Sequence, residues 1–211
     1  MSGRETPFFE TEVLEWEEES LEPNEYRFVN TWRLRGSVED VADIIDEPVN
    51  YQHWWPCAWL DYEGISHGDK QEVGGVFRYK VKGWMPYTLN LTFKVVDVRA
   101  PYGYTVEATG DLVGRGTWTI SQEGELVLIK YEWRVRGDRW FIRRLSRPLK
   151  PLFRSNHFWV MRNGARSLQL ELARRRATTR EELRRIPAPR GPTFPHNLRR
   201  RRRTSADPAS T

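Results

Sequence analysis

The stretch PLFRSNHFWVMRNGARSLQLELARRR, residues 151–176, decides the fold, because its inward residues recur at three- and four-residue spacing. That stripe consists of Phe153, His157, Val160, Met161, Ala165, Leu168 and Leu172. Pro151 suits the first turn of a helix, and Arg174–Arg176 suit the negative end of its dipole. We therefore expect one helix of roughly 26 residues, about 39 Å long.

The segments before this helix have a different period, because apolar and polar residues alternate along them. In YRFVNTWRLR (26–35), Phe28, Trp32 and Leu34 alternate with arginines, which is typical of a half-buried strand. Similar patterns predict strands at 59–65, 76–82, 88–99, 104–109, 115–121 and 126–135. Short turn-type connections join most of these strands, which indicates an antiparallel meander.

Two short helices are expected between the first two strands. Ser37 caps one, and the other runs through Asn50–Trp54 to Pro56. A change of apolar phase at Val95–Val96 predicts a bulge that curves the sheet. A curved sheet and one long striped helix pack economically when the helix lies in the concavity. The sequence therefore predicts an α+β fold, a curved antiparallel sheet wrapped around a long C-terminal helix.

The charge of the chain divides it into three parts. Residues 1–25 carry nine Glu and one Arg, which predicts an acidic N-terminal arm. Residues 178–211 are rich in proline and arginine, including Arg199–Arg203, which predicts a disordered tail. The folded domain is expected at 26–177, where the charges nearly balance.

The composition restricts the class of protein. A single cysteine, Cys57, excludes an intramolecular disulfide, and Arg outnumbers Lys 28 to 6, as in GC-rich bacterial genes. The sequence shows no secretory signal pattern and no run of roughly 20 apolar residues. We therefore expect a cytoplasmic protein, at most peripheral to a membrane. The oligomeric state has no signature in the sequence.

The order of elements resembles the helix-grip fold of the START-like, Bet v 1-like superfamily. Within it, the resemblance is to bacterial polyketide cyclase/dehydrase and lipid-transport proteins, the SRPBCC proteins. It covers 26–177 and also rests on local marks: Ser37-Val-Glu-Asp, Trp54-Trp55-Pro56, Gly74-Gly75, Gly110-Asp111-Leu112 with Gly114 and Gly116, Trp133, and Asn156–Arg162. The resemblance implies a cavity for a hydrophobic ligand, but none of these marks is a catalytic signature.

The chain contains ten Trp, nine Phe and eight Tyr, which suit either a thick core or the wall of a ligand cavity. The residues expected to contact a ligand are Phe77, Tyr79, Leu91, Phe93, Trp118, Tyr131, Trp133, Phe153, His157 and Met161. Strand parity makes Tyr79, Tyr131 and Asn30 candidates to orient the ligand by hydrogen bonds, or else to pair with protein neighbours.

His157 is the candidate catalytic residue. An imidazole on the inward stripe could act as a general acid or base near neutral pH. The alternative is a structural histidine bonded to Tyr79, Asn30 or a backbone carbonyl.

Other chemistry finds no support in the sequence. No His, Cys or carboxylate group has the spacing of metal ligands, and no phosphate loop or nucleophile elbow is present, so no metal and no cofactor are expected. Arg199–Arg203 could attract nucleic acid or acidic lipids through non-specific electrostatics, or fold back on the Glu-rich N-terminal arm. No nucleic-acid-binding module accompanies it, so no specific nucleic-acid partner is expected.

The basic and aromatic segment RWFIRRLSRPLKPLFR (139–154) is a candidate interaction surface near one end of the expected cavity. The segment could rest on an anionic membrane and allow a lipid to enter the cavity. Alternatively, it is the start of a helix whose apolar residues pack inward and whose arginines are solvated.

Three hypotheses follow. The first is binding, with or without transport, of a small hydrophobic lipid-like or polyketide-like molecule. The second is an enzyme of the polyketide cyclase or aromatase kind. The third is a membrane-peripheral interaction protein that uses residues 139–154.

Overall fold

The structure is a computed structural model that describes residues 22, 24–70, 72–137 and 140–198, with only the backbone at 140–143 and 145–147. Its elements are β1 (Glu25–Arg35), α1 (Val38–Ile45), η1 (Pro48–Asn50), α2 (Tyr51–Trp54), β2 (Trp59–Ser66), β3 (Val76–Val81), β4 (Leu89–Val98), β5 (Tyr104–Gly110), β6 (Leu112–Glu123), β7 (Leu126–Gly137), α3 (Trp140–Arg176) and α4 (Arg180–Arg185). This order confirms the predicted α+β fold of helix-grip type.

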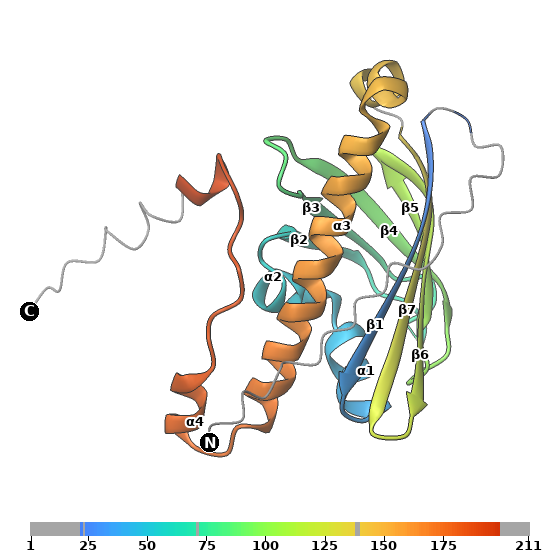
Figure 1. The fold of residues 1–211 in the computed structure, drawn as a ribbon. Helices are drawn as coiled ribbons and strands as arrows, with labels where there is room; N and C mark the ends of the chain where they lie inside the picture. The colour runs from blue at the N-terminus through green and yellow to red at the C-terminus, as the bar shows by residue number, and fades with distance from the viewer. Residues whose placement is uncertain (1–21, 23, 71, 138–139, 199–211) are drawn as a thin grey trace, which may run out of the picture.

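The seven strands form one antiparallel sheet in the order β1-β7-β6-β5-β4-β3-β2. Strands β2 to β7 are the predicted meander, and β1 joins it by pairing along its whole length with β7. The register between β4 and β5 shifts between Val95 and Asp97, which confirms the predicted bulge. The sheet curves, and α3 runs along its concave face (Figure 1).

The inward rows of the strands and helices meet in one apolar core. Helix α3 contributes the buried members of the predicted stripe, Phe153, Met161, Ala165, Leu168 and Leu172. In β1 the alternation places Phe28, Trp32 and Leu34 in the core, as predicted.

The prediction that α3 begins near Pro151 was wrong, because the helix already begins at Trp140. Pro148 and Pro151 lie inside it. A proline removes one backbone donor and crowds the carbonyl four residues earlier, so a helix that continues through it bends. Figure 1 shows α3 changing direction near its N-terminal end.

The C-terminal end of α3 is tied to the first helices by two ion pairs. Arg176 lies 2.5 Å from Asp40 of α1, and Arg175 lies 3.1 Å from Glu47, just before η1. Pairs between such exposed groups contribute about 0–1 kcal/mol each. They therefore orient the end of the helix more than they stabilise the domain.

After α3 the chain continues in a C-terminal segment, residues 178–198, on the side of α3 away from the sheet (Figure 1). Thr179 and Glu182 form a capping box that begins α4. Further on, the Arg190 guanidinium lies 5.3 Å from the centre of the Trp159 ring on α3. These residues belong to the segment for which the sequence predicts disorder, and that disorder stays a prediction.

The proposed division of the chain at residues 25 and 177 stays a prediction. Most of the acidic arm 1–25 and residues 199–211 of the tail lie outside the described residues.

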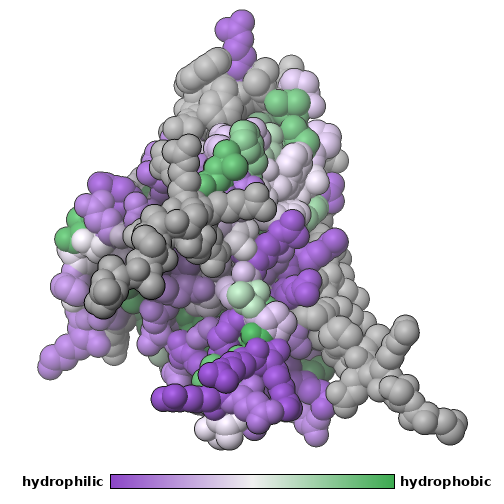
Figure 2. Space-filling view, turned by 90° about the vertical axis from the view of Figure 1, so that its left-hand side faces the viewer, coloured by the Kyte–Doolittle hydropathy of each residue, from purple (hydrophilic) through white to green (hydrophobic). Residues whose placement is uncertain are grey.

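Figure 2 shows the face that carries the C-terminal segment, residues 178–198. Hydrophilic side chains dominate its lower part, at the height of α4.

Candidate functional site

A cavity of about 180 Å³ lies between the concave face of the sheet and α3. Its wall is almost entirely aromatic and aliphatic. All ten residues that the sequence selected as ligand contacts line this one cavity: Phe77, Tyr79, Leu91, Phe93, Trp118, Tyr131, Trp133, Phe153, His157 and Met161. Their contact with a ligand stays a prediction.

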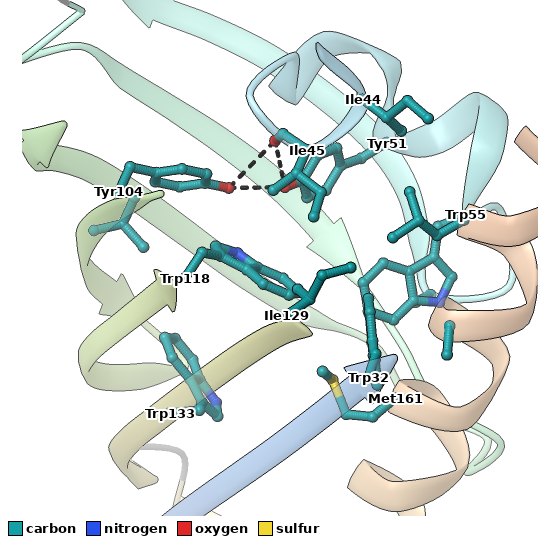
Figure 3. Packing of buried hydrophobic residues seen from close by; sticks show 14 of the residues in the cluster. Trp32, Ile44, Ile45, Tyr51, Trp55, Tyr104, Trp118, Ile129, Trp133 and Met161 are labelled. Carbon is teal, nitrogen blue, oxygen red and sulfur yellow. Dashed lines mark hydrogen bonds between the residues drawn. The ribbon is translucent and has the colours of Figure 1, made fainter. Parts of the chain in front are cut away.

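The sheet register brings these side chains together in pairs. Phe77 and Tyr79 of β3 lie opposite Phe93 and Leu91 of β4. Trp118 of β6 lies opposite Tyr131 of β7, and their rings stack with centroids 4.2 Å apart. Figure 3 shows Trp118 and Trp133 projecting from the sheet into the interior, with Met161 projecting from α3.

Gly116 leaves room for this aromatic wall. A β-carbon at Gly116 would lie 2.8 Å from both the Tyr131 hydroxyl oxygen and a carbon of the Trp133 ring. Any larger residue at this position would displace one of the two rings.

The sequence reasoning missed several aromatic residues of the wall, among them Tyr51, Trp55, Trp59 and Tyr104. Tyr104 could have been found, because strand parity places it on the same face as Val106. Tyr51 lies in the short helix α2, Trp55 follows it directly, and Trp59 begins β2 after the turn that leaves α2. Their direction depends on how α2 packs on the sheet, which no local pattern reveals.

Of the three proposed ligand-orienting side chains, Tyr79 is occupied by a protein partner, and Asn30 is half occupied because its buried Oδ1 has no hydrogen bond within the described part of the chain. The Tyr79 hydroxyl donates a hydrogen bond to the Pro48 carbonyl, and the Asn30 amide nitrogen lies 3.0 Å from Nε2 of His157. Among the tyrosines that sequence reasoning missed, Tyr51 donates to the Ile45 carbonyl at 2.7 Å, and its hydroxyl lies 2.7 Å from that of Tyr104 (Figure 3). These groups support the wall.

Tyr131 differs from the other candidates. Its hydroxyl forms no hydrogen bond within the described part of the chain, although the side chain lines the cavity. Burial raises the pKa of Tyr131 well above the ordinary value of 10, so the group stays a neutral phenol. It can therefore donate a hydrogen bond to a ligand and accept one from it.

Asn156 of α3 supplies a second polar group to the wall. Its side-chain oxygen accepts a hydrogen bond from the Met85 amide at 3.1 Å. Its NH₂ group has no partner among the described residues. Tyr131 and Asn156 are thus uncharged groups of the wall that keep hydrogen-bonding capacity for a ligand.

His157 has the surroundings of a structural histidine. Its ring stacks on Phe28 with centroids 3.8 Å apart and planes 13° apart. Because the Asn30 amide nitrogen is a donor, Nε2 accepts and Nδ1 carries the hydrogen. Burial lowers the pKa of His157 from 6.5 to about 3. A base with so low a pKa removes protons poorly near neutral pH, so this geometry favours the structural interpretation.

Metal and thiol chemistry have no support among the described residues. No three His, Cys, Asp or Glu side chains of that part of the chain gather closely enough to hold a metal ion. Cys57 is fully buried, and burial raises the pKa of its thiol to about 12. It therefore stays protonated and weakly nucleophilic.

The basic and aromatic segment 139–154 lies mainly in the first turns of α3, and seven of its side chains in α3 are outside the described residues. Its role at a membrane surface therefore stays a prediction. Over the described range, no helix is both long enough and apolar enough to span a bilayer.

No protein-family model matches the sequence, and no curated protein matches it. Solved structures do match. The Zhui aromatase/cyclase from Streptomyces sp. R1128 has a TM-score of 0.54 and 14% identity, covering 73% of this chain and 97% of that chain. The protein TTHA0849 from Thermus thermophilus has a TM-score of 0.56 and 13% identity, covering 72% of this chain and 99% of that chain.

A START superfamily protein from Mycobacterium smegmatis also matches, with a TM-score of 0.52 and 12% identity, covering 67% of this chain and 98% of that chain. At such low identities these likenesses concern the course of the backbone alone.

Proposed function

Because the chain has the helix-grip fold of the START-like, Bet v 1-like superfamily, we propose that it binds a small hydrophobic molecule in the cavity beneath α3. The observation that carries this proposal is the cavity itself, about 180 Å³ within an otherwise packed aromatic core. Small-molecule sites are typically concave, mostly apolar pockets with a few polar groups, and this cavity has that character.

The volume of the cavity limits the size of the ligand that fits into it. An apolar cavity of about 150 Å³ holds one benzene molecule, so the 180 Å³ cavity holds one or two rings or a short chain. A long acyl chain would not fit into this space alone. The Tyr131 and Asn156 side chains favour a ring that carries a hydroxyl or carbonyl group, as polyketide-like molecules do.

Two measurements test the proposal. Native mass spectrometry of gently purified protein should reveal a bound mass that disappears under denaturing conditions. The probe 2-naphthol, a two-ring phenol, should shift the NMR signal of the Met161 methyl group, which is buried and lines the cavity. The Met85 methyl group, which does not line the cavity, serves as the internal control. An apo mass together with an unmoved Met161 signal would overturn the proposal.

A second candidate function is that of a cyclase or aromatase, the activity named for the Zhui protein. It rests on Tyr131, a protonated phenol in the wall that could donate a hydrogen bond to a reacting carbonyl. If the protein turns over a polyketide-like substrate, Tyr131→Phe should lower kcat in addition to raising KM, because the hydrogen bond is lost both to the bound substrate and to the reacting carbonyl. Equal kcat values for both proteins would exclude this role.

A further inference from the structure

A second and larger hollow, which we call the outer groove, lies beside the cavity. It measures about 810 Å³ and is bordered by the end of α1, the β2–β3 hairpin and the β4–β5 turn. Its wall is more polar than that of the cavity and carries both signs of charge. The charged and polar residues include Asp46, Ser66, His67, Lys70, Glu72 and Arg99.

The cavity and the outer groove share part of their wall. Pro48, Phe77 and Tyr104 line both spaces. One layer of side chains therefore separates the apolar cavity from the more polar groove.

The three shared residues differ in how firmly they are held. Pro48 is the first residue of η1, and its carbonyl oxygen accepts the hydrogen bond from the Tyr79 hydroxyl. The Tyr104 hydroxyl lies 2.7 Å from that of Tyr51. Phe77 has no polar group, so its ring can rotate without breaking a hydrogen bond.

Phe77 borders the groove beside Tyr62, whose ring centre lies 6.3 Å from that of Phe77 and whose hydroxyl oxygen lies 3.3 Å from where a β-carbon on Gly64 would stand. Gly64 of β2 is the partner of Phe77 across the sheet and has no side chain. The pairing of β2 and β3 shifts register just beyond this point, between Gly64 and Ser66. Unlike Pro48 and Tyr104, the Phe77 side chain is held by ring contacts alone, with Tyr62, Tyr79 and Phe93. Phe77 is therefore the movable part of the shared wall.

We propose that the cavity and the outer groove form one bipartite ligand site, with the Phe77 ring as the gate between them. The occupant is an amphipathic molecule whose apolar ring enters the cavity while its polar end stays in the groove. This proposal rests on the proposed function and extends it.

The dimensions and charges support this class of ligand. Ligand pockets usually measure about 300–1,000 Å³, and the groove lies within this range whereas the cavity alone is smaller. Because Asp46 and Glu72 face the same groove as Lys70 and Arg99, neither sign of charge prevails there. An uncharged end with hydroxyl and carbonyl groups can bond to both kinds of side chain.

The two probes for the test are 2-naphthol and its glucoside, 2-naphthyl β-D-glucopyranoside. The naphthyl ring is the same in both, and the glucose adds an uncharged hydroxyl-rich end. We expect the glucoside to bind at least as tightly as 2-naphthol. Ser66→Trp, at an exposed position in the groove, should weaken the glucoside at least tenfold and 2-naphthol less than twofold. Glu63→Trp, exposed on the same strand and outside the groove lining, is the matched control.

The gate is tested by the association rate in stopped-flow experiments. Phe77→Ala should speed the association of both probes at least tenfold. Phe93→Ala removes the same atoms from the cross-strand partner, which lines the cavity alone, and should change the rate less than threefold. Phe77→Leu, a milder change, replaces Phe77→Ala if the latter fails to fold.

Each outcome decides one point. Equal acceleration by the two alanine variants would remove Phe77 as the gate. Binding of 2-naphthol without binding of the glucoside would overturn the bipartite site and leave the proposed function intact. If neither probe bound, both proposals would fall together.

Discussion

The buried Lys82 ammonium lies 3.0 Å from the backbone carbonyl oxygen of Thr193, although 111 positions separate the two residues in the sequence. It also donates to the Phe194 carbonyl at 2.9 Å. Burial lowers the pKa of Lys82, and no carboxylate pairs with it within the described part of the chain. The two carbonyls thus satisfy the ammonium, and the ammonium holds the C-terminal segment beside the β3–β4 connection.

Replacing this ammonium should release the segment. Lys82→Met keeps the length of the side chain and removes the two hydrogen bonds, so amide exchange in residues 187–198 should speed up at least tenfold. The free energy of unfolding should change by less than about 2 kcal/mol, because the freed carbonyls can reach water. Hydrogen–deuterium exchange with mass spectrometry measures the first effect, and urea unfolding measures the second.

The control for this experiment is Lys80→Met, at an exposed position on β3. It removes the same charge without touching the C-terminal segment. Identical exchange in the two variants would show that Lys82 does not hold the segment.

The two tyrosines Tyr131 and Tyr79 should respond differently to loss of the hydroxyl. Tyr131→Phe removes a group that has no partner in the described part of the chain, so affinity for 2-naphthol should fall about 3- to 10-fold with little loss of stability. Tyr79→Phe leaves the Pro48 carbonyl without its donor, which should cost about 1–3 kcal/mol of stability. Calorimetric titration and urea unfolding of both variants give the comparison. The reverse pattern would contradict the assignment of roles.

The depressed pKa of His157 makes stability depend on pH. The unfolded chain binds a proton near pH 6.5, whereas the folded chain resists protonation down to about 3. Stability should therefore fall as the pH drops from about 6.5 towards 3, by about 1.4 kcal/mol per pH unit from this group. His157→Gln keeps a partner for Asn30 and does not ionise, so its stability curve should be flatter by this amount.

Urea unfolding at a series of pH values measures the two curves. His53→Gln, the same substitution at an exposed position on α2, is the matched control. Parallel curves for wild type and His157→Gln would refute the predicted linkage.

Gly164 lets the buried Trp55 ring lie directly against α3. A β-carbon at this position would stand 2.3 Å from a carbon of that ring. Alanine favours a helix by about 1 kcal/mol over glycine, but overpacking a core costs about 1–3 kcal/mol. Gly164→Ala should therefore destabilise the protein in urea unfolding and weaken 2-naphthol, because Trp55 also lines the cavity. A gain of stability would mean that the ring moves aside freely.

Much of the fold and of the cavity wall could be predicted from the sequence, because the direction of a side chain follows from local periodicity. Alternation along β3 and β4 selected Phe77, Tyr79, Leu91 and Phe93, and all four line the cavity. The helical stripe selected Met161 in the same way. The early start of α3 was missed, since two prolines normally mark a boundary that tertiary packing here overrides.

The sequence by itself thus determined the curved sheet, the long helix and which side chains face the interior. Only the tertiary structure decided which polar groups remain free, leaving Tyr131 without a partner in the described part of the chain while the Asn30 amide nitrogen and the Tyr79 hydroxyl are paired. It also decided that Phe77 separates two spaces and that Lys82 holds a distant segment. The physical reason is that hydrogen bonds and shared walls join residues far apart in the chain, and local periodicity carries no information about such pairs.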